Sequence, residues 1–162
     1  AGRKIPLKYR NDVAMSGRLG MEIQPKNMTE EEKNQCRKGI ADYKRVRPVI
    51  QFGDQYRLLS PYEGAGAASL MYVSQDRDEA VFFWWKTEHF YNQHLPKIAM
   101  AGLDPDATYR IEELDSDGSK APGFVGKSFT GRFLMSSGLE IPAGGEYASR
   151  VLHLVRVPGI NE

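Results

Sequence analysis

The sequence predicts a mainly β fold, an antiparallel β-sandwich preceded by one short strand and one α-helix. After residue 53, short segments rich in β-branched and aromatic residues alternate with turn signals, which is typical of a sandwich. Before that point, one long segment shows helical capping and helical periodicity. The chain therefore divides near Phe52 into two expected units, residues 1–52 and residues 53–162.

The composition supports a buried core. Of the 162 residues, 41% are hydrophobic and 27% are charged, which argues against disorder. The formal net charge of +1 indicates neither a nucleic-acid partner nor an anionic membrane, and the sequence has no apolar run near the roughly 20 residues of a spanning helix. Neither a signal-peptide pattern nor an initiator Met opens the sequence, so we expect a processed product or an excised fragment. The single cysteine, Cys36, excludes an internal disulfide and leaves the compartment open.

The short strand is expected within residues 12–23 (DVAMSGRLGMEI). This stretch mixes small and apolar residues. Gly17 and Gly20 suit a tight turn at a strand end or a close approach of backbone.

The helix that follows is the clearest element. Thr29 can cap it, and Glu32 stands three residues later, at the capping-box spacing. Pro48 is expected to end it. The residues expected on its buried face, with Val46 beside them, are Cys36, Ile40, Tyr43 and Arg47. The basic residues expected in its last turn, where cations suit the helix dipole, are Lys44, Arg45 and Arg47.

Short strands separated by polar breaks make up the rest. The expected strands are Tyr56–Leu59, Ser69–Gln75, Glu79–Lys86, Lys97–Ala101, Ala107–Leu114, Leu139–Pro142 and Tyr147–Val157. Turns are expected at residues 76–78 and 104–106, and a loop at residues 115–126.

No residue pattern predicts a metal, a cofactor or a nucleophile. The histidines, His89, His94 and His153, lack ligand spacing, and we expect His89 and His94 to be loop residues. Gly64-Ala65-Gly66 lacks the helix and lysine of a phosphate loop, and Cys36 is expected to be a buried hydrophobe. The aspartates expected to have structural turn roles are Asp54, Asp76, Asp78, Asp104, Asp106, Asp115 and Asp117.

Three groups of residues form an ordered set along the chain. The first is Arg10, Asn11, Val13, Ala14, Gly17, Gly20 and Glu22. The second, on the helix, is Thr29, Glu30, Glu31, Tyr43, Lys44, Arg47 and Pro48. The third is Gly53-Asp54-x-Tyr56-Arg57-Leu58, residues 102–109, Gly138-Leu139 and Tyr147-Ala148-Ser149-Arg150. This set resembles the end of the catalytic barrel and the C-terminal domain of family 36 glycoside hydrolases, and it covers nearly the whole chain.

The resemblance implies a parent α-galactosidase with an N-terminal β-supersandwich, a (β/α)8 barrel and this C-terminal sandwich. It implies hydrolysis of terminal α-galactosides, with retention, by two aspartates that lie before Ala1. No catalytic residue is therefore expected in this chain. A complete barrel takes about 250 residues, so residues 1–52 are expected to hold only its last strand and helix. Residues 53–162 are expected to be structural.

Two alternatives remain open at this point. The first is a free-standing carbohydrate-binding module, in which Trp84 or Trp85 would lie on an open face. Alternate residues of the run Phe82-Phe83-Trp84-Trp85 face opposite sides of a strand, and we favour core and domain contacts over a sugar platform. The second is a parent that acts as an α-N-acetylgalactosaminidase or a raffinose-synthase-like transferase. The sequence leaves homo-oligomerisation and the compartment undecided.

Overall fold

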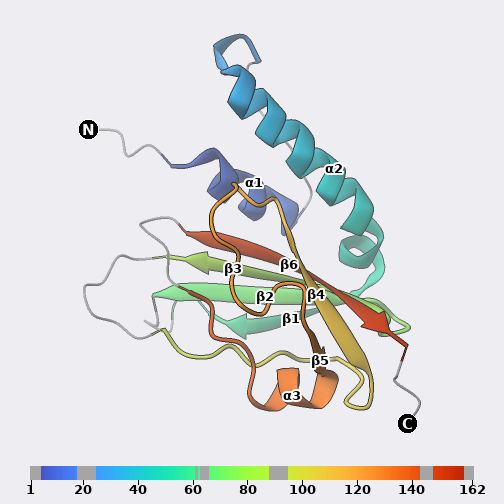
Figure 1. Ribbon diagram of the computed structural model, residues 1–162. Coiled ribbons are helices and arrows are strands. Elements are labelled where there is room, and N and C mark those ends of the chain that lie inside the picture. Colours follow the sequence, from blue (N-terminus) through green and yellow to red (C-terminus); the bar gives the residue numbers. More distant parts are fainter. Residues whose placement is uncertain are drawn as a thin grey trace.

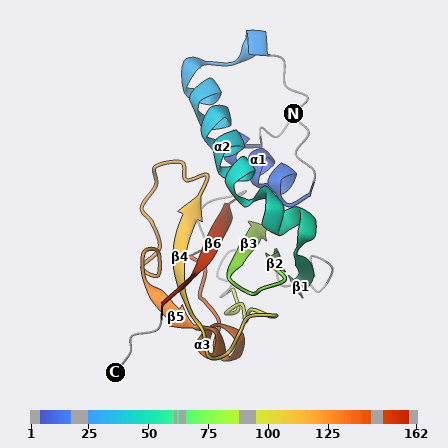
Figure 2. The same cartoon turned by 90° about the vertical axis from the view of Figure 1, so that its right-hand side faces the viewer.

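The chain folds into a six-stranded antiparallel sheet with a different layer on each face. The computed structural model describes residues 5–17, 25–60, 62, 66–87, 95–142 and 148–158. Two helices, α1 (Leu7–Met15) and α2 (Glu30–Phe52), lie over one face of the sheet (Figure 1). The short helix α3 (Gly131–Ser136) lies on the opposite side, as the rotated view shows (Figure 2). None of the described helices is long and apolar enough to cross a membrane.

The strands are β1 (Asp54–Leu59), β2 (Ala67–Val73), β3 (Glu79–Lys86), β4 (Thr108–Leu114), β5 (Ser128–Thr130) and β6 (Ser149–Val157). Their order across the sheet is β1-β2-β3-β6-β4-β5, and every pairing is antiparallel. The mainly β, antiparallel prediction is confirmed. The described strands form one sheet, and the layer opposite α1 and α2 consists of loop segments and α3. The apolar side chains that cover this face are far apart in the sequence, for example Ile98, Leu103 and Ile141. They form no continuous helical or strand pattern, so loop segments carry them.

The first helix corrects the prediction of a strand at residues 12–23. Residues 12–15 belong to α1, while residues 18–24 lie outside the described part of the chain. Helix α1 buries Asn11, Asp12 and Met15, of which only Met15 is apolar. Period-based reasoning missed α1 because its buried face is mostly polar and gives no hydrophobic periodicity.

Helix α2 begins as predicted and ends later. Thr29 Oγ1 accepts a hydrogen bond of 3.1 Å from the backbone N–H of Glu32, which confirms the cap. The prediction that Pro48 ends the helix is wrong, since α2 continues to Phe52. Pro48 and Lys44 lie on the exposed side, so water can satisfy the Lys44 carbonyl that Pro48 leaves without a donor. The basic residues expected in the last turn consequently lie before it.

The buried face of α2 is shifted from the predicted one. Cys36, Tyr43 and Val46 are buried as expected, but Ile40 is half-buried and Arg47 is exposed. The residues buried along the helix are Cys36, Gly39, Tyr43, Val46, Val49 and Ile50. Most of these residues lie in the second half of α2, because that half packs on the strands.

Most strand predictions hold within two residues, and β3 has the predicted bounds. Lys97–Ala101 and Leu139–Pro142 are not strands; a single antiparallel bridge joins Ile98 to Leu139. β5 and α3 were not predicted, because three and six residues are too few to show a periodic pattern. The turn at residues 76–78 is confirmed, with Arg77 at φ 59°.

Two hydrophobic cores lie on the two faces of the sheet, and β3 contributes to both. Phe82 and Trp84 pack in the core under the loop layer. Phe83 and Trp85 pack in the core under the helices, where they meet Tyr43 and Val46 of α2. The helical layer is therefore bound to the sheet by a shared core.

Gly53 is the single residue between α2 and β1. A Cβ at this position would collide with the backbone carbonyl oxygens of Val49 and Val73. Only glycine lets the chain leave the helix and enter the sheet with no linker.

We expect Gly53→Ala to lower the free energy of unfolding by about 1–3 kcal/mol, because backbone must shift to admit the methyl group. Urea unfolding of the purified chain measures the loss. The matched control is Gly123→Ala, where an added Cβ has nothing within 4 Å. Equal stability of the two variants would contradict the close approach at Gly53.

Candidate functional site

The aromatic run of β3 offers no open face. Trp84 is 1% exposed and Trp85 is 8% exposed. The Phe83 and Trp85 rings stack with centroids 5.8 Å apart inside the core under the helices. The alternative that placed one of these tryptophans on an exposed sugar platform is therefore wrong.

The other residues considered as candidates in the sequence form no common site among the described residues. Gly64, Ala65, His89, His94 and Tyr147 lie outside the described residues. His153 is buried on β6, and its Nε2 lies 3.1 Å from Glu79 Oε1. Cys36 is buried as expected, and burial raises the pKa of its thiol. Within the described ranges, no group of three or more His, Cys, Asp or Glu side chains could hold a metal ion.

Three of the turn aspartates serve their expected structural role. Asp76 accepts hydrogen bonds from Ser74 Oγ at 2.6 Å and from the Asp78 backbone N–H at 2.9 Å, which lower the pKa of its carboxyl group. Asp104 and Asp117 each accept a bond from the backbone N–H two residues later. These contacts fix the turns.

Asp115 departs from the expected pattern. It is fully buried, with φ 49°, at the end of β4. It lies beside Asp12 of α1, which is also fully buried. Sequence reasoning gave Asp115 a structural turn role and did not single out Asp12. The signal was weak, because an aspartate after a strand usually serves a turn in water.

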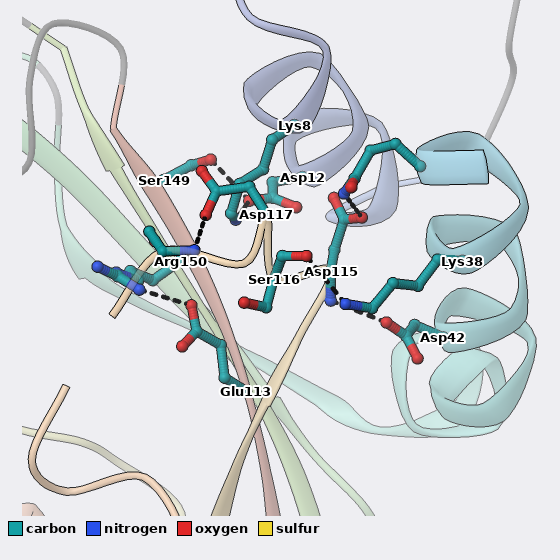
Figure 3. A network of polar contacts seen from close by, with 12 residues as sticks. Lys8, Asp12, Lys38, Asp42, Glu113, Asp115, Ser116, Asp117, Ser149 and Arg150 are labelled. Carbon is teal, nitrogen blue, oxygen red and sulfur yellow. Dashed lines mark hydrogen bonds and ion pairs between the residues drawn. The ribbon is translucent and has the colours of Figure 1, made fainter. Parts of the chain in front are cut away.

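These two aspartates form the centre of a polar junction between the helices and the sheet (Figure 3). We define the junction as Lys8, Asp12, Gln35, Lys38, Asp42, Asp115, Ser116 and Ser149. Its members come from α1, α2, the loop after β4 and β6, so four distant segments of the chain meet there.

Asp12 joins α1 to the sheet. Its Oδ2 accepts a hydrogen bond of 2.5 Å from Lys8 Nζ, one turn earlier on the helix. The same oxygen accepts a hydrogen bond of 2.6 Å from Ser149 Oγ at the start of β6. The ammonium compensates the buried carboxylate, and the serine fixes its position.

Asp115 joins the loop after β4 to α2. Gln35 Nε2 donates to Asp115 Oδ1 at 2.8 Å, and the Asp115 backbone N–H donates to Asp42 Oδ2 at 2.8 Å. Lys38 Nζ donates to the Ser116 carbonyl at 2.9 Å. Gly39 makes room for this approach, since a Cβ there would lie 3.2 Å from Asp115 Oδ1.

Burial and the neighbouring acid raise the pKa of Asp115. Desolvation is the largest cause, followed by the Asp12 carboxyl group, which is within hydrogen-bonding reach and of like charge. The Lys8 ammonium and the Gln35 amide oppose the rise, and together these effects place the pKa of Asp115 at about 8. A pKa raised this far favours the protonated form of the Asp115 carboxyl group at neutral pH.

The junction is closed to a substrate. Both carboxyl groups are fully buried. A pocket of about 440 Å³ among the described residues is lined by other residues: Gly17, Tyr43, Ile50, Gln51, Phe52 and Tyr72. Two carboxylates that water cannot reach have no route to a glycoside or another reactant. Their chemistry is therefore limited to holding segments together and holding a proton.

Comparison with known proteins gives two matching family models. A model for the glycosyl hydrolase family 36 C-terminal domain matches residues 67–154. A melibiase model matches residues 1–53. The melibiase match ends at Gly53, and the C-terminal domain match begins at Ala67, the first residue of β2.

The curated relatives are α-galactosidases. Probable alpha-galactosidase C from Aspergillus terreus is 32% identical over 157 residues, which are 96% of this chain and 19% of that protein. Alpha-galactosidase AgaA from Geobacillus stearothermophilus is 44% identical over 113 residues, 70% of this chain and 15% of that protein.

Among solved structures, GH36 alpha-galactosidase AgaB from Geobacillus stearothermophilus matches with a TM-score of 0.82 and 37% identity, covering 97% of this chain and 20% of its own. A variant of AgaA from that organism in complex with raffinose matches with a TM-score of 0.83 and 35% identity, covering 96% and 20%. The chain thus spans about a fifth of the length of the relatives it matches.

We expect Lys8→Met to destabilise the chain by about 3–5 kcal/mol at pH 7, because it leaves Asp12 as an uncompensated buried charge. Urea unfolding measures the loss. The matched control is Arg132→Met, which breaks an ion pair with Asp106 whose side chains are 70% and 84% exposed. That change should stay within about 0.5 kcal/mol of the unchanged chain. Similar losses in both variants would contradict the role of Lys8.

Proposed function

This chain belongs to glycosyl hydrolase family 36 and matches the C-terminal domain of that family. From that premise, we propose that it is the C-terminal part of a longer, retaining α-galactosidase. The single observation that carries the proposal is the alignment of nearly the whole chain with α-galactosidases that are about five times longer. The melibiase match at residues 1–53 supports the same assignment for the helical part.

The proposed substrates of the parent enzyme are oligosaccharides that end in an α-galactoside. Two solved relatives are complexes of AgaA variants, one with raffinose and one with stachyose. Both cover 96–97% of this chain at 35% identity. In the parent, substrate binding and both catalytic aspartates are assigned to the part of the enzyme outside this chain, so no residue of the chain is given a catalytic role.

The role proposed for the chain is structural. Residues 1–52 would be the end of the catalytic barrel, and residues 53–162 would be the C-terminal β domain. The core shared by α2 and the sheet supports this role, because it ties the barrel end to the domain without a linker. The closed junction around Asp12 and Asp115 supports it as well, since these buried carboxyl groups cannot meet a substrate.

The first measurement is the size of the native protein. An antibody raised against this chain should recognise a species several times heavier than 18.2 kDa, and that species should cleave a chromogenic α-galactoside. The purified 162-residue chain should show no cleavage. A native species of 18.2 kDa, or cleavage by the chain alone, would contradict the proposal.

Removing the equivalent of residues 54–162 from the parent enzyme should lower its melting temperature more than it lowers kcat of the molecules that remain folded. The physical reason is that truncation exposes the face of α2 that carries Tyr43, Val46 and Ile50, which is buried against the sheet. Thermal unfolding and active-site titration separate the two effects. An unchanged melting temperature would contradict the structural role.

A further inference from the structure

The two helices of the helical layer are attached to the sheet by different kinds of contact. Helix α2 packs through apolar side chains such as Tyr43, Val46 and Ile50. Helix α1 buries one apolar residue, Met15, and two polar ones, Asn11 and Asp12. Tyr9 of α1 adds a partly buried ring against the core and a hydrogen bond of 3.1 Å to the Lys86 carbonyl. Because this apolar contact is smaller than that of α2, the attachment of α1 is the more sensitive to whether the polar groups beneath it are compensated.

Each carboxyl group of the central pair has one oxygen with partners and one without. Asp12 Oδ2 is bonded by Lys8 and Ser149, and Asp115 Oδ1 is bonded by Gln35. Asp12 Oδ1 and Asp115 Oδ2 are buried and have no hydrogen-bond partner among the described residues. A proton held between the neighbouring carboxyl groups would supply the missing donor. The nearby buried donor, Asn11 Nδ2, is itself without a partner among the described residues and does not bond to either oxygen.

The charges around the pair give the same answer. Lys8 is the cation bonded to the pair, while Lys38 donates to the Ser116 carbonyl and Arg150 is bonded to Glu113 at 2.7 Å. With both carboxyl groups ionised, the buried centre would carry one net negative charge, and with one proton it is neutral. The titratable and charged groups that surround the pair are Lys8 and Arg10 of α1, Glu32, Cys36, Lys38 and Asp42 of α2, Glu113 of β4, Asp117 of the following loop and Arg150 of β6.

We propose that Asp12 and Asp115 share one proton, and that this proton holds α1 against the sheet as a latch. When the proton leaves to bulk water, two like charges remain beside one ammonium in a closed site. Relief then comes from the element with the weakest apolar attachment, which is α1. The proposal concerns the fold of this chain and does not depend on the reaction of the parent enzyme.

The sign of the pH effect follows from the closed and open states. The closed state raises the pKa of Asp115 to about 8, whereas an open state exposes the carboxyl group to water, where its ordinary value is 3.8. The closed state therefore binds more protons between these values, so the latch is strongest at low pH. Opening of α1 should rise by about tenfold per pH unit from about pH 5 to about pH 8 and level off above it.

The first test is direct titration of the shared proton. In the chain labelled with ¹³C at aspartate carboxyl carbons, one resonance should titrate near pH 8 by NMR, and Asp115→Asn should remove it. Lys8→Met should move that titration to higher pH, because the ammonium lowers the pKa of Asp115. If every aspartate titrates below about pH 5, the shared proton does not exist and the proposal fails.

The second test is the opening of α1. Amide hydrogen exchange, corrected for the intrinsic rate at each pH, should show protection of α1 falling about 100-fold from pH 5.5 to pH 7.5 in the unchanged chain. In Asp115→Asn it should stay flat, because the amide donates a hydrogen bond at every pH and asparagine tolerates φ 49°. Asp117→Asn, an exposed position two residues away, should behave like the unchanged chain.

The variants keep both outcomes decisive. If Asp115→Asn does not fold, Asp12→Asn removes the like charge, and the Asp115 titration should then move to lower pH. A titration near pH 8 with α1 protection that ignores pH would overturn the latch, because the proton would be shared without holding the helix. Equal pH dependence in Asp115→Asn and Asp117→Asn would overturn it too.

Discussion

The apolar run along β3 is the constraint on which the fold depends. Because successive residues of a strand point to opposite faces, Phe82 and Trp84 need cover on one side, and Phe83 and Trp85 need it on the other. Burying one such side chain contributes about 1.5–3 kcal/mol, so neither face can stay open to water at low cost. β3 lies between β2 and β6 inside the sheet, and both layers therefore form around it.

This constraint makes the helical segment part of the same core as the sheet. The chain changes from one matched family model to the other near Gly53, yet Tyr43 and Val46 of α2 pack in the core that holds Phe83. A sheet without α2 would expose that core, and α2 without the sheet would expose its buried face. The two matched parts therefore share one hydrophobic core and stabilise each other. Because Gly53 alone separates α2 from β1, no linker lets the two parts move apart.

How far the sequence predicts this architecture depends on how local each cause is. The Thr29 cap and the bounds of β3 follow from neighbours a few residues away and were predicted. The continuation of α2 through Pro48 depends on which side of the helix faces water, and that is decided by the sheet. Helix α1 and the pairing of Asp12 with Asp115 depend on residues about a hundred positions apart, and a polar buried face leaves no periodic signal. The candidate site was therefore not predictable from local patterns, because nothing in the sequence near Asp12 indicates that it meets Asp115.

The contrast between the two helices explains why ionisable groups stand at the junction. Apolar contacts are non-directional, so the core under α2 stabilises the layer without fixing where a second helix sits. The bond from Ser149 to Asp12 and the bond from the Tyr9 hydroxyl to the Lys86 carbonyl are directional, and they position α1 on the sheet. A helix positioned by a buried carboxyl group depends on the balance of charge beneath it, whereas α2 also has an extensive apolar core to hold it. The same layer thus combines a helix held mainly by apolar packing with one that, on the proposal above, is held in part by a single proton.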